Sequence, residues 1–553
     1  MKNFWSSESH QVCLFGRVVT KISEANEKSQ QTINKINMKR LSSIICQLTM
    51  CVTLLMFMAS CSKNQATKLI PEDAVFVVRL DVAKMQEKAG LKDGKSSLKE
   101  WLKEQVESSD MSKELSKKML AIIDDPTASG FDFTEPVYFY LSGDMRANVD
   151  AGMVGAVASK GDLTDLMEAL TEEMGGKVEV EEADGGEKYV YANGIALIYN
   201  GDWFYFGQSN DIDETIETLK ERADGKGSLS DNKAFAQMEE KEGLMQFLFL
   251  GSGLEEMLER MKTNRSAELA MKNIEDVLPD GIKLEDISSL TDFVLNDGEL
   301  LLTTEIPAPS DKMKEQIDKY DELAKDISKE LAQYSSGEML NLFVNADAMT
   351  IFKNIKPMLK EEMGREELDI IESLVKDLDG SLALDLYAIN EEGQPQLSVY
   401  AGTKSDKGLA FIVQNLGEEI DSIDTDEYLI PIKEYDWFEE TYTVKSHSGL
   451  GFKDGMTYYV SNPDYAFEVP GEEFPTKELK GKAFYARFNF GFFDNLAKMA
   501  GAEEGEIFEK IADTYDYAEA YYEGGGKGVF RITTKDKKTN PVQALFKLIE
   551  EYI

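Results

Sequence analysis

The stretch Val75-Phe76-Val77-Val78-Arg79-Leu80-Asp81 is an apolar strand that leads into a predicted amphipathic helix from about Val82. The same strand-then-helix arrangement occurs three more times, with strands beginning at Phe247, Leu340 and Phe484. Asp, Asn and Ser residues at these junctions can cap the unpaired amides of the helix that starts there. The recurrence predicts a chain that repeats one order of strands and helices.

Three further features follow in the same order in both parts of the chain. Each part has a strand that ends in a polar segment and opens a helix, then a hairpin, then a closing hairpin before a terminal helix. Asn-Gly and Asp-Gly favour tight hairpins because they tolerate positive φ. The matched segments are Ala158–Asp162 with Gly402–Asp406, Asn200-Gly201 with Asp454-Gly455, and Asp297-Gly298 with Gly524–Gly526.

These patterns predict an α+β fold made of two homologous halves, residues 69–335 and 336–553. Strands with one apolar face imply a mixed, mostly antiparallel sheet in each half, packed with helices on that face. Long helical tracts are predicted over 96–123, 310–334, 348–375 and 490–512. The alternative to duplication is chance recurrence of a strand–helix motif that any α+β protein uses.

The composition restricts the class of partner. The chain has 553 residues with 60 Lys+Arg against 102 Asp+Glu, for a net charge of −42. Nucleic-acid binding depends on clustered Lys and Arg, and so does docking on anionic lipid. The charge therefore argues against both partners. Hydrophobic residues at 42% are enough for a sizeable core.

The N-terminus resembles a bacterial lipoprotein signal. Met38-Lys39-Arg40 is a basic segment, and the apolar run from Leu41 to Met58 suits a signal peptide better than a membrane span. It ends at Met58-Ala59-Ser60-Cys61, which resembles a lipobox. The resemblance implies cleavage between Ser60 and Cys61 and lipidation of Cys61. The alternative, an uncleaved anchor with an incidental cysteine, leaves this ending unexplained.

Residues 1–37 precede a complete signal peptide at 38–60, so we interpret them as an over-called start. Residues 61–68 are predicted to be a polar tether. Two acyl chains suffice for stable anchoring. No acidic cluster follows Cys61. We therefore expect an outer-membrane lipoprotein of the cell envelope that faces the periplasm rather than the surface.

No coherent catalytic set emerges from the sequence. His447 is the single histidine after the leader, and no G-x-S-x-G motif is present. A His/Cys zinc site is excluded by the number of ligands. Gly251-Ser252-Gly253 lacks the third glycine of a dinucleotide loop, so we interpret it as a tight strand–helix turn. We predict no catalytic residues, no metal and no cofactor beyond the lipid on Cys61.

Two weaker signals remain. The acidic clusters at 210–214, 377–380 and 421–426 offer oxygen ligands for calcium but lack the twelve-residue loop. Calcium binding is therefore left open. Aromatic side chains gather at recognition surfaces. Most here alternate on strands and are predicted to be core, and the best exposed candidates are Tyr515, Tyr517, Tyr521 and Tyr522.

The lipobox, the segment Ile70–Asp81 and Lys88-Ala89-Gly90-Leu91 resemble an uncharacterised lipoprotein family of Bacteroidota that carries a domain of unknown function. The resemblance extends over the whole mature chain and implies no activity. We therefore expect a lipid-anchored, non-enzymatic binding or structural protein, held to the membrane by lipid, with a protein or glycan partner. The alternative is a glycan-directed hydrolase, periplasmic or at the surface, that acts through a carboxylate pair.

Overall fold

The structure is a computed structural model of the whole chain. It describes the following residues: 65–88, 97–109, 111–144, 148–173, 178–260, 271–272, 274, 278, 281–362, 364–390, 394–416, 421–424, 427–436, 441–468, 474–500 and 502–552.

The first part of the chain begins with a short 3₁₀ helix, η1 (Ala66–Leu69), and ends with the helix α12. Its strands are β1 (Ala74–Leu80), β2 (Phe131–Asp132), β3 (Val137–Asp144), β4 (Asn148–Val157), β5 (Glu181–Glu182), β6 (Lys188–Ala192), β7 (Ile195–Tyr199), β8 (Trp203–Gln208), β9 (Met245–Leu250), β10 (Ser288–Asn296) and β11 (Glu299–Glu305). Its helices are α3 (Val82–Lys88), α4 (Ser97–Ser108), α5 (Lys113–Asp124), α6 (Lys160–Glu173), α7 (Ile212–Ala223), α8 (Lys233–Glu239), α9 (Gly251–Arg260), α11 (Asp311–Leu323) and α12 (Lys329–Ala332).

The second part runs from β12 to the C-terminal helix α18. Its strands are β12 (Leu340–Asn345), β13 (Leu378–Ile389), β14 (Pro395–Thr403), β15 (Asp421–Asp424), β16 (Glu427–Asp436), β17 (Thr441–Lys453), β18 (Met456–Val460), β19 (Phe484–Asn489), β20 (Tyr515–Gly524) and β21 (Lys527–Thr534). Its helices are α13 (Ala348–Glu362), α14 (Arg365–Asp377), α15 (Lys407–Leu416), α16 (Phe493–Ala500), α17 (Ala502–Thr514) and α18 (Pro541–Tyr552).

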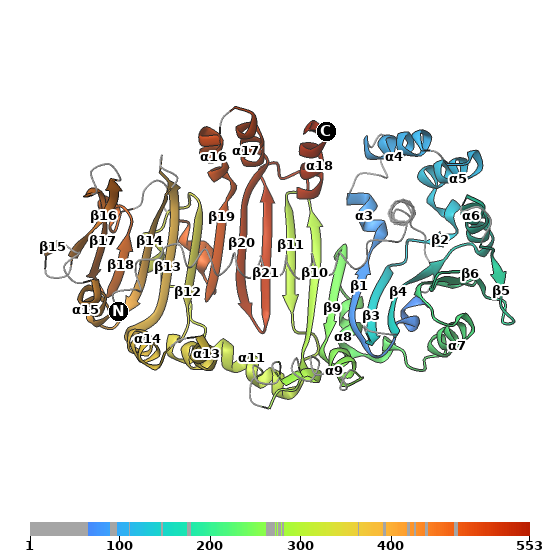
Figure 1. Cartoon of the computed structure of the whole chain (residues 1–553), viewed down its shortest axis with the longest axis horizontal. Coiled ribbons are helices and arrows are strands. Elements are labelled where there is room, and N and C mark those ends of the chain that lie inside the picture. Colours follow the sequence, from blue (N-terminus) through green and yellow to red (C-terminus); the bar gives the residue numbers. More distant parts are fainter. Residues whose placement is uncertain are drawn as a thin grey trace. The chain divides into compact units, whose positions relative to one another are not determined.

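The strands form one sheet in which the described pairings are antiparallel (Figure 1). In the first part the ladder order is β5-β6-β7-β8-β4-β3-β1-β9-β10-β11. In the second it is β15-β16-β17-β18-β14-β13-β12-β19-β20-β21. The last strand of each part, β11 and β21, pair with each other and join the two ladders. The prediction of helices plus an antiparallel sheet is confirmed.

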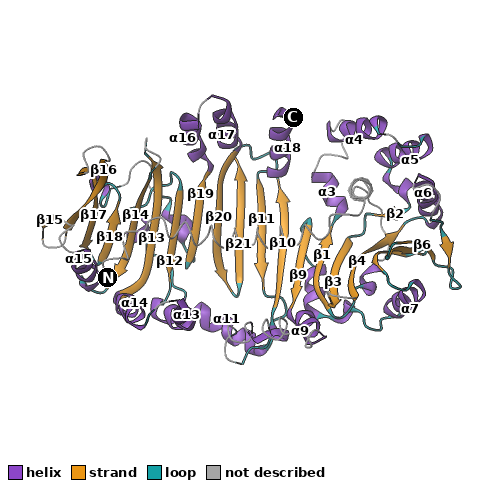
Figure 2. Ribbon diagram, viewed as in Figure 1, coloured by secondary structure: helices purple, strands orange, loops and turns teal. Residues whose placement is uncertain are grey.

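The long helical tracts are each divided. The tract predicted over 96–123 consists of α4, which ends at Ser108, and α5, which begins at Lys113. Ser112 caps α5 by accepting a hydrogen bond from the amide of Leu115, so the hydroxyl competes with helix continuation. The other three tracts are likewise divided, into α11 with α12, α13 with α14, and α16 with α17. In Figure 2 these helices gather at the ends of the strands.

One face of the sheet carries two hydrophobic cores. The first includes Val77, Tyr138 and Leu248, and the second includes Phe343, Tyr400 and Tyr485. Ala66 is fully buried in the first core, so the fold begins before the end of the tether predicted at 61–68. The second core also includes Ile327, Leu331 and Ala332, which precede the division predicted at 335.

A buried carboxylate fixes the start of β12. Asp385 on β13 is 1% exposed and accepts hydrogen bonds from the Ser336 amide at 2.7 Å, the Ser336 hydroxyl at 3.1 Å and the Asn341 side-chain amide at 2.8 Å. These donors favour the ionised carboxylate, but burial outweighs them and raises the pKa of Asp385 to about 6. Folding therefore binds a proton at this site under mildly acidic conditions.

The Gly251-Ser252-Gly253 segment is a tight strand–helix junction, as the sequence predicts. A Cβ at Gly253 would lie 2.2 Å from the carbonyl oxygen of Ala74, and one at Gly251 would lie 1.9 Å from that of Leu284. Both neighbours are backbone atoms that cannot rotate away. Gly253 thus allows α9 to pack directly against the start of β1, and Gly251 allows it to approach the backbone at Leu284.

Replacing Gly253 with alanine should destabilise the protein by about 2 kcal/mol, because the added methyl group overlaps a backbone carbonyl. Denaturant unfolding measures this change. Gly201→Ala is the matched control, since a Cβ there meets nothing within 4 Å. Equal unfolding midpoints for the two variants would contradict the close approach of α9 to β1.

The stability of the protein should fall as pH rises from about 4 to about 6 through the contribution of Asp385. Its pKa is raised in the folded state above the unfolded value of about 3.9, so the proton is lost at a cost of about 3 kcal/mol across this window. Asp385→Asn should remove this part of the slope in unfolding measured at several pH values. The exposed Asp464→Asn variant serves as control and should leave the slope intact.

Candidate functional site: an apolar sheet face

The face of the sheet opposite the two cores is also apolar. Registered cross-strand neighbours share one face of a sheet, so the pairings define continuous rows of side chains. One row crosses ten strands, from β1 through the β11–β21 junction to β14. It consists of Leu80, Met245, Phe293, Leu302, Phe530, Ala520, Ala486, Leu342, Leu384 and Val399. A second row beside it consists of Leu295, Leu300, Ile532, Ala518, Phe488, Leu340, Leu386 and Leu397. We call these two rows, with the flanking Phe76, Phe247, Phe249 and Phe484, the apolar face.

Part of the apolar face is accessible to solvent, whereas Leu80 and Leu295 at one end of the rows are buried. Phe247, Phe484 and Phe530 are 40%, 38% and 37% exposed, which is high for phenylalanine on a central strand. Leu302 and Leu342, beside them in the ladder, are half-buried. Phe76 packs against Phe247 and Phe249 with ring centroids 5.3 Å apart in both cases. The exposed apolar surface therefore extends over several neighbouring strands and is not limited to isolated side chains.

No charged residue stands in either row. An antiparallel sheet with one face on a core usually shows polar residues on its other face. Here that second face is apolar, in a chain with 102 acidic residues. Extended exposed apolar surfaces mark interaction sites in soluble domains. The apolar face is therefore the candidate functional site.

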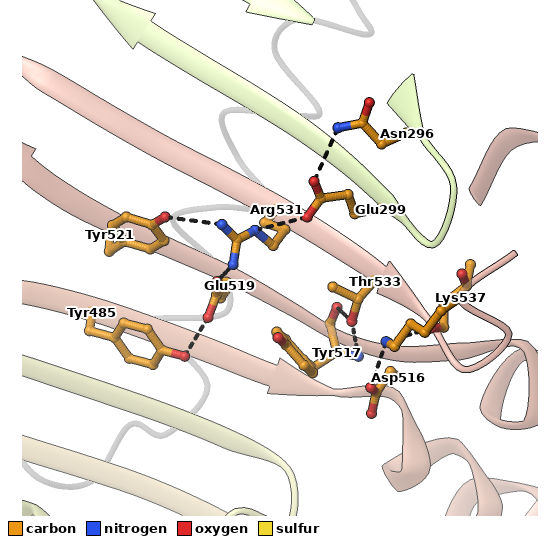
Figure 3. A network of polar contacts seen from close by, with 11 residues as sticks. Asn296, Glu299, Tyr485, Asp516, Tyr517, Glu519, Tyr521, Arg531, Thr533 and Lys537 are labelled. Atoms are coloured by element: carbon orange, nitrogen blue, oxygen red, sulfur yellow. Dashed lines mark hydrogen bonds and ion pairs between the residues drawn. The ribbon is translucent and has the colours of Figure 1, made fainter. Parts of the chain in front are cut away.

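A network of charged side chains lies on the opposite face, at the junction of the two ladders (Figure 3). The Arg531 guanidinium donates to the Glu519 carboxylate at 2.9 Å and lies 3.5 Å from that of Glu299 across the β11–β21 pairing. The Tyr485 hydroxyl donates to Glu519 at 2.6 Å. Glu519 is only 3% exposed, so this network holds a buried charge that its partners neutralise.

Two further cations of this region lie over aromatic rings. The Lys482 ammonium lies 3.7 Å from the ring centroid of Tyr521, and the Arg487 guanidinium lies 3.8 Å from that of Tyr517. Burial lowers the pKa of Lys482. The buried Nε of Arg487 has no hydrogen-bond partner among the described residues, so the Tyr517 ring offers it a cation–π contact instead.

The four predicted surface tyrosines all lie on β20 but do not form one surface. Tyr521 is 8% exposed and belongs to the second core. Tyr517 lies in the charged region, and Tyr515 donates to the carbonyl of Pro541 at 2.9 Å. Tyr522 lies on the other face and donates to Asp321 at 2.6 Å. Burial raises the pKa of each of the four, to about 12 for Tyr522, so all remain hydrogen-bond donors.

The carboxylates near the predicted acidic clusters have local partners. Asp377 accepts from the Ser405 hydroxyl at 2.7 Å, and Asp211 caps α7. Asp211, Glu214 and Tyr205 line a hollow of about 280 Å³. Among the residues that the structure describes, no group of three or more His, Cys, Asp or Glu is placed to hold a metal. His447 lies on β17 opposite Pro431. The hydrolase alternative stays a prediction.

Ser60 and Cys61 lie outside the described residues, as does the signal segment 38–60. In the described part of the chain, no helix combines the length and the apolar character that crossing a membrane requires.

These features define an α+β protein with an extended antiparallel sheet and a candidate binding face. A family model, "Domain of unknown function (DUF4836)", matches residues 66–487, and the chain belongs to this family. Comparison with curated proteins gave no match. Among solved structures, crystal form III of TP0453 is similar at 11% identity over 47% of this chain and 86% of that one, with a TM-score of 0.25.

The sequence does contain a signal for the apolar face. Phe76-Val77-Val78, Phe247-Leu248-Phe249-Leu250 and Leu300-Leu301-Leu302 are unbroken apolar runs. Since side chains alternate across a strand, such runs are apolar on both faces. The prediction of one apolar face per strand is corrected by the exposed phenylalanines, because the core fills only one side of these strands. Exposed aromatic side chains are nevertheless a minority among the described residues, in line with the prediction that most of them are core.

Replacing Arg531 with methionine should destabilise the protein by about 3 kcal/mol, because it leaves the buried Glu519 carboxylate without its cation. Adding Glu519→Gln should restore part of the loss, which a double-mutant cycle of unfolding free energies measures. Lys537→Met is the control, since its ion pair with Asp516 is exposed and worth below about 1 kcal/mol. Simple additivity of the two substitutions would contradict the coupling.

Proposed function

We propose that this protein is a lipid-anchored, non-enzymatic binding protein of the cell envelope, and that the apolar face is its binding surface. The observation that carries this proposal is the uncharged, accessible second face of the sheet. A glycan needs hydrogen-bonding side chains, which the two rows lack. The face therefore favours an apolar partner over a sugar.

The proposed anchor is a diacylglyceryl and acyl lipid on Cys61, after cleavage between Ser60 and Cys61. Its support is the lipobox-like sequence Met58-Ala59-Ser60-Cys61 together with the start of the fold at the buried Ala66. Five residues span at most about 18 Å. An anchor at Cys61 would therefore hold the folded chain close to the membrane. The same signal supports an outer-membrane, periplasm-facing location in a bacterium of the Bacteroidota.

We also propose that the two parts of the chain arose by duplication of one half. The two ladder orders support this, since each strand of the first occupies the same place as a strand of the second. A polar set of cross-strand neighbours recurs at matching strands. It is Arg79, Gln246 and Asp292 on β1, β9 and β10, and Asn341, Arg487 and Glu519 on β12, β19 and β20.

Replacing Cys61 with alanine in the full chain tests the anchor. The unchanged protein should sediment with membranes and incorporate an alkyne fatty-acid analogue, and the variant should lose the label because no thiol remains to be acylated. Cys51→Ala, which alters another cysteine of the leader, should keep both properties. A Cys61→Ala protein that still takes up the label would overturn the proposed anchor.

A further inference from the structure

We propose that the apolar face binds the acyl chains of a diacyl lipid whose headgroup carries no net charge, taken up one lipid at a time. This inference rests on the proposed function and names the ligand class of the same face.

The first argument is charge complementarity. The rows through Leu302 and Phe530 carry no ionic side chain, although the protein has a net charge of −42. The ionic groups of the junction lie on the other face, where Arg531 is held by Glu519 and Glu299. A ligand lying along the two rows therefore meets no charged side chain of the rows themselves and does not have to desolvate one. The Asp321 carboxylate, beside the rows, already accepts hydrogen bonds from the Tyr522 hydroxyl at 2.6 Å and the Gly525 amide at 2.7 Å. Hydrocarbon chains match such a surface.

The second argument concerns hydrogen bonds. The backbone groups along these strands are paired in the ladder, and the rows consist of leucine, isoleucine, valine, methionine, phenylalanine and alanine. A protein interface normally forms about one hydrogen bond per 100–200 Å² and carries a polar rim. The two rows offer almost no donors or acceptors for such contacts. Acyl chains need none, so they fit this face better than a polypeptide or a second copy does.

The third argument is size. Neighbouring strands lie about 4.8 Å apart, so the ten-strand row from Leu80 to Val399 extends roughly 43 Å. This exceeds the roughly 30 Å thickness of a bilayer's hydrocarbon core. The second row, two residues away on eight of these ten strands, doubles the width there. Two acyl chains of one lipid therefore find a continuous apolar path within the face.

The overall charge selects among headgroups. With 102 acidic against 60 basic residues, the protein repels anionic lipid and an anionic membrane surface. A zwitterionic headgroup avoids this repulsion while its chains are bound. We therefore assign zwitterionic over anionic lipid as the preferred ligand.

The test uses the full chain carrying Cys61→Ala, so that an acyl group on the protein itself cannot occupy the face. The protein is titrated into vesicles that contain pyrene-labelled phosphatidylcholine at a density at which neighbouring pyrenes form excimers. Transfer of single lipids to the protein separates the pyrenes and is followed as loss of excimer fluorescence. Leu302→Glu with Phe530→Glu places two charges at the centre of the face and should reduce binding at least about tenfold. The control pair, Val444→Glu with Leu545→Glu, changes residues that are 51% and 49% exposed and lie outside the rows. It should bind within about twofold of the parent.

Anionic phosphatidylglycerol carrying the same label should transfer to the protein less well than phosphatidylcholine. High salt should reduce this difference in transfer between the two lipids, because it screens the repulsion. A photoactivatable diazirine acyl chain on phosphatidylcholine provides a second measurement that needs no variant. It should crosslink to peptides of β10, β11, β20 and β21.

Several outcomes would overturn the proposal. The first is that no lipid transfers to the parent protein. The second is that lipid transfers equally well to the Leu302→Glu/Phe530→Glu variant and to the control pair. The third is that crosslinks occur only outside β10, β11, β20 and β21. A parent dimer that becomes monomeric on Leu302→Glu, without lipid transfer, would instead identify a second copy as the occupant. Membrane anchoring is measured separately through Cys61. Fatty-acid label that persists on the Cys61→Ala protein, together with lipid transfer to the face, would therefore overturn only the proposed anchor.

Discussion

The pairing of β11 with β21 is the contact on which the extended architecture depends. Six registered residue pairs, from Glu299 with Thr533 to Thr304 with Gly528, join the closing strand of one ladder to that of the other. A strand at a sheet edge exposes unpaired amides and carbonyls that invite association with another chain. By pairing two such edges, the molecule satisfies both. The same pairing places Leu302 beside Phe530, which makes the apolar rows continuous between the two parts.

The two faces of this junction have opposite characters for a physical reason. Arg531 and Glu519 lie on the face where tyrosines and the core surround them, and there the ion pair, the Tyr485 hydroxyl and Glu299 satisfy one another. A buried charge is tolerable only when its partners are fixed in this way. Leaving Phe530 and Phe247 accessible forfeits about 25 cal/mol for each Å² of apolar surface not buried. A fold that retains such a surface across ten strands forgoes stability that a ligand on the surface would restore.

Local sequence predicts the individual strands and hairpins, but it does not predict how distant strands pair. Periodicity and turn chemistry are local, so the apolar strand at 75–80 and the hairpin at Asp454-Gly455, where both residues have positive φ, were predicted correctly. The hairpin at Asn200-Gly201 was also predicted, but neither residue has positive φ, and the turn is held by the Asn200 side chain, which accepts from the amides of Asp202 and Trp203. The β11–β21 pairing joins residues more than 200 positions apart, and nothing local determines it. The break between α4 and α5 was missed because Ser112 acts through a side-chain cap, which hydrophobic periodicity does not detect. For the tyrosines on β20, residue type alone did not predict which face each occupies.

The strong negative charge of the protein opposes self-association through the apolar face. A surface of this kind would promote self-association in a neutral protein, since apolar faces of two copies can cover each other. Two chains that each carry a net charge of −42 repel one another at close range, and the repulsion acts over about 8 Å at physiological ionic strength. An uncharged acyl chain is not repelled. The acidity thus discriminates between the two occupants that the apolar rows could otherwise accept, and it favours the lipid over the second copy most strongly at low salt.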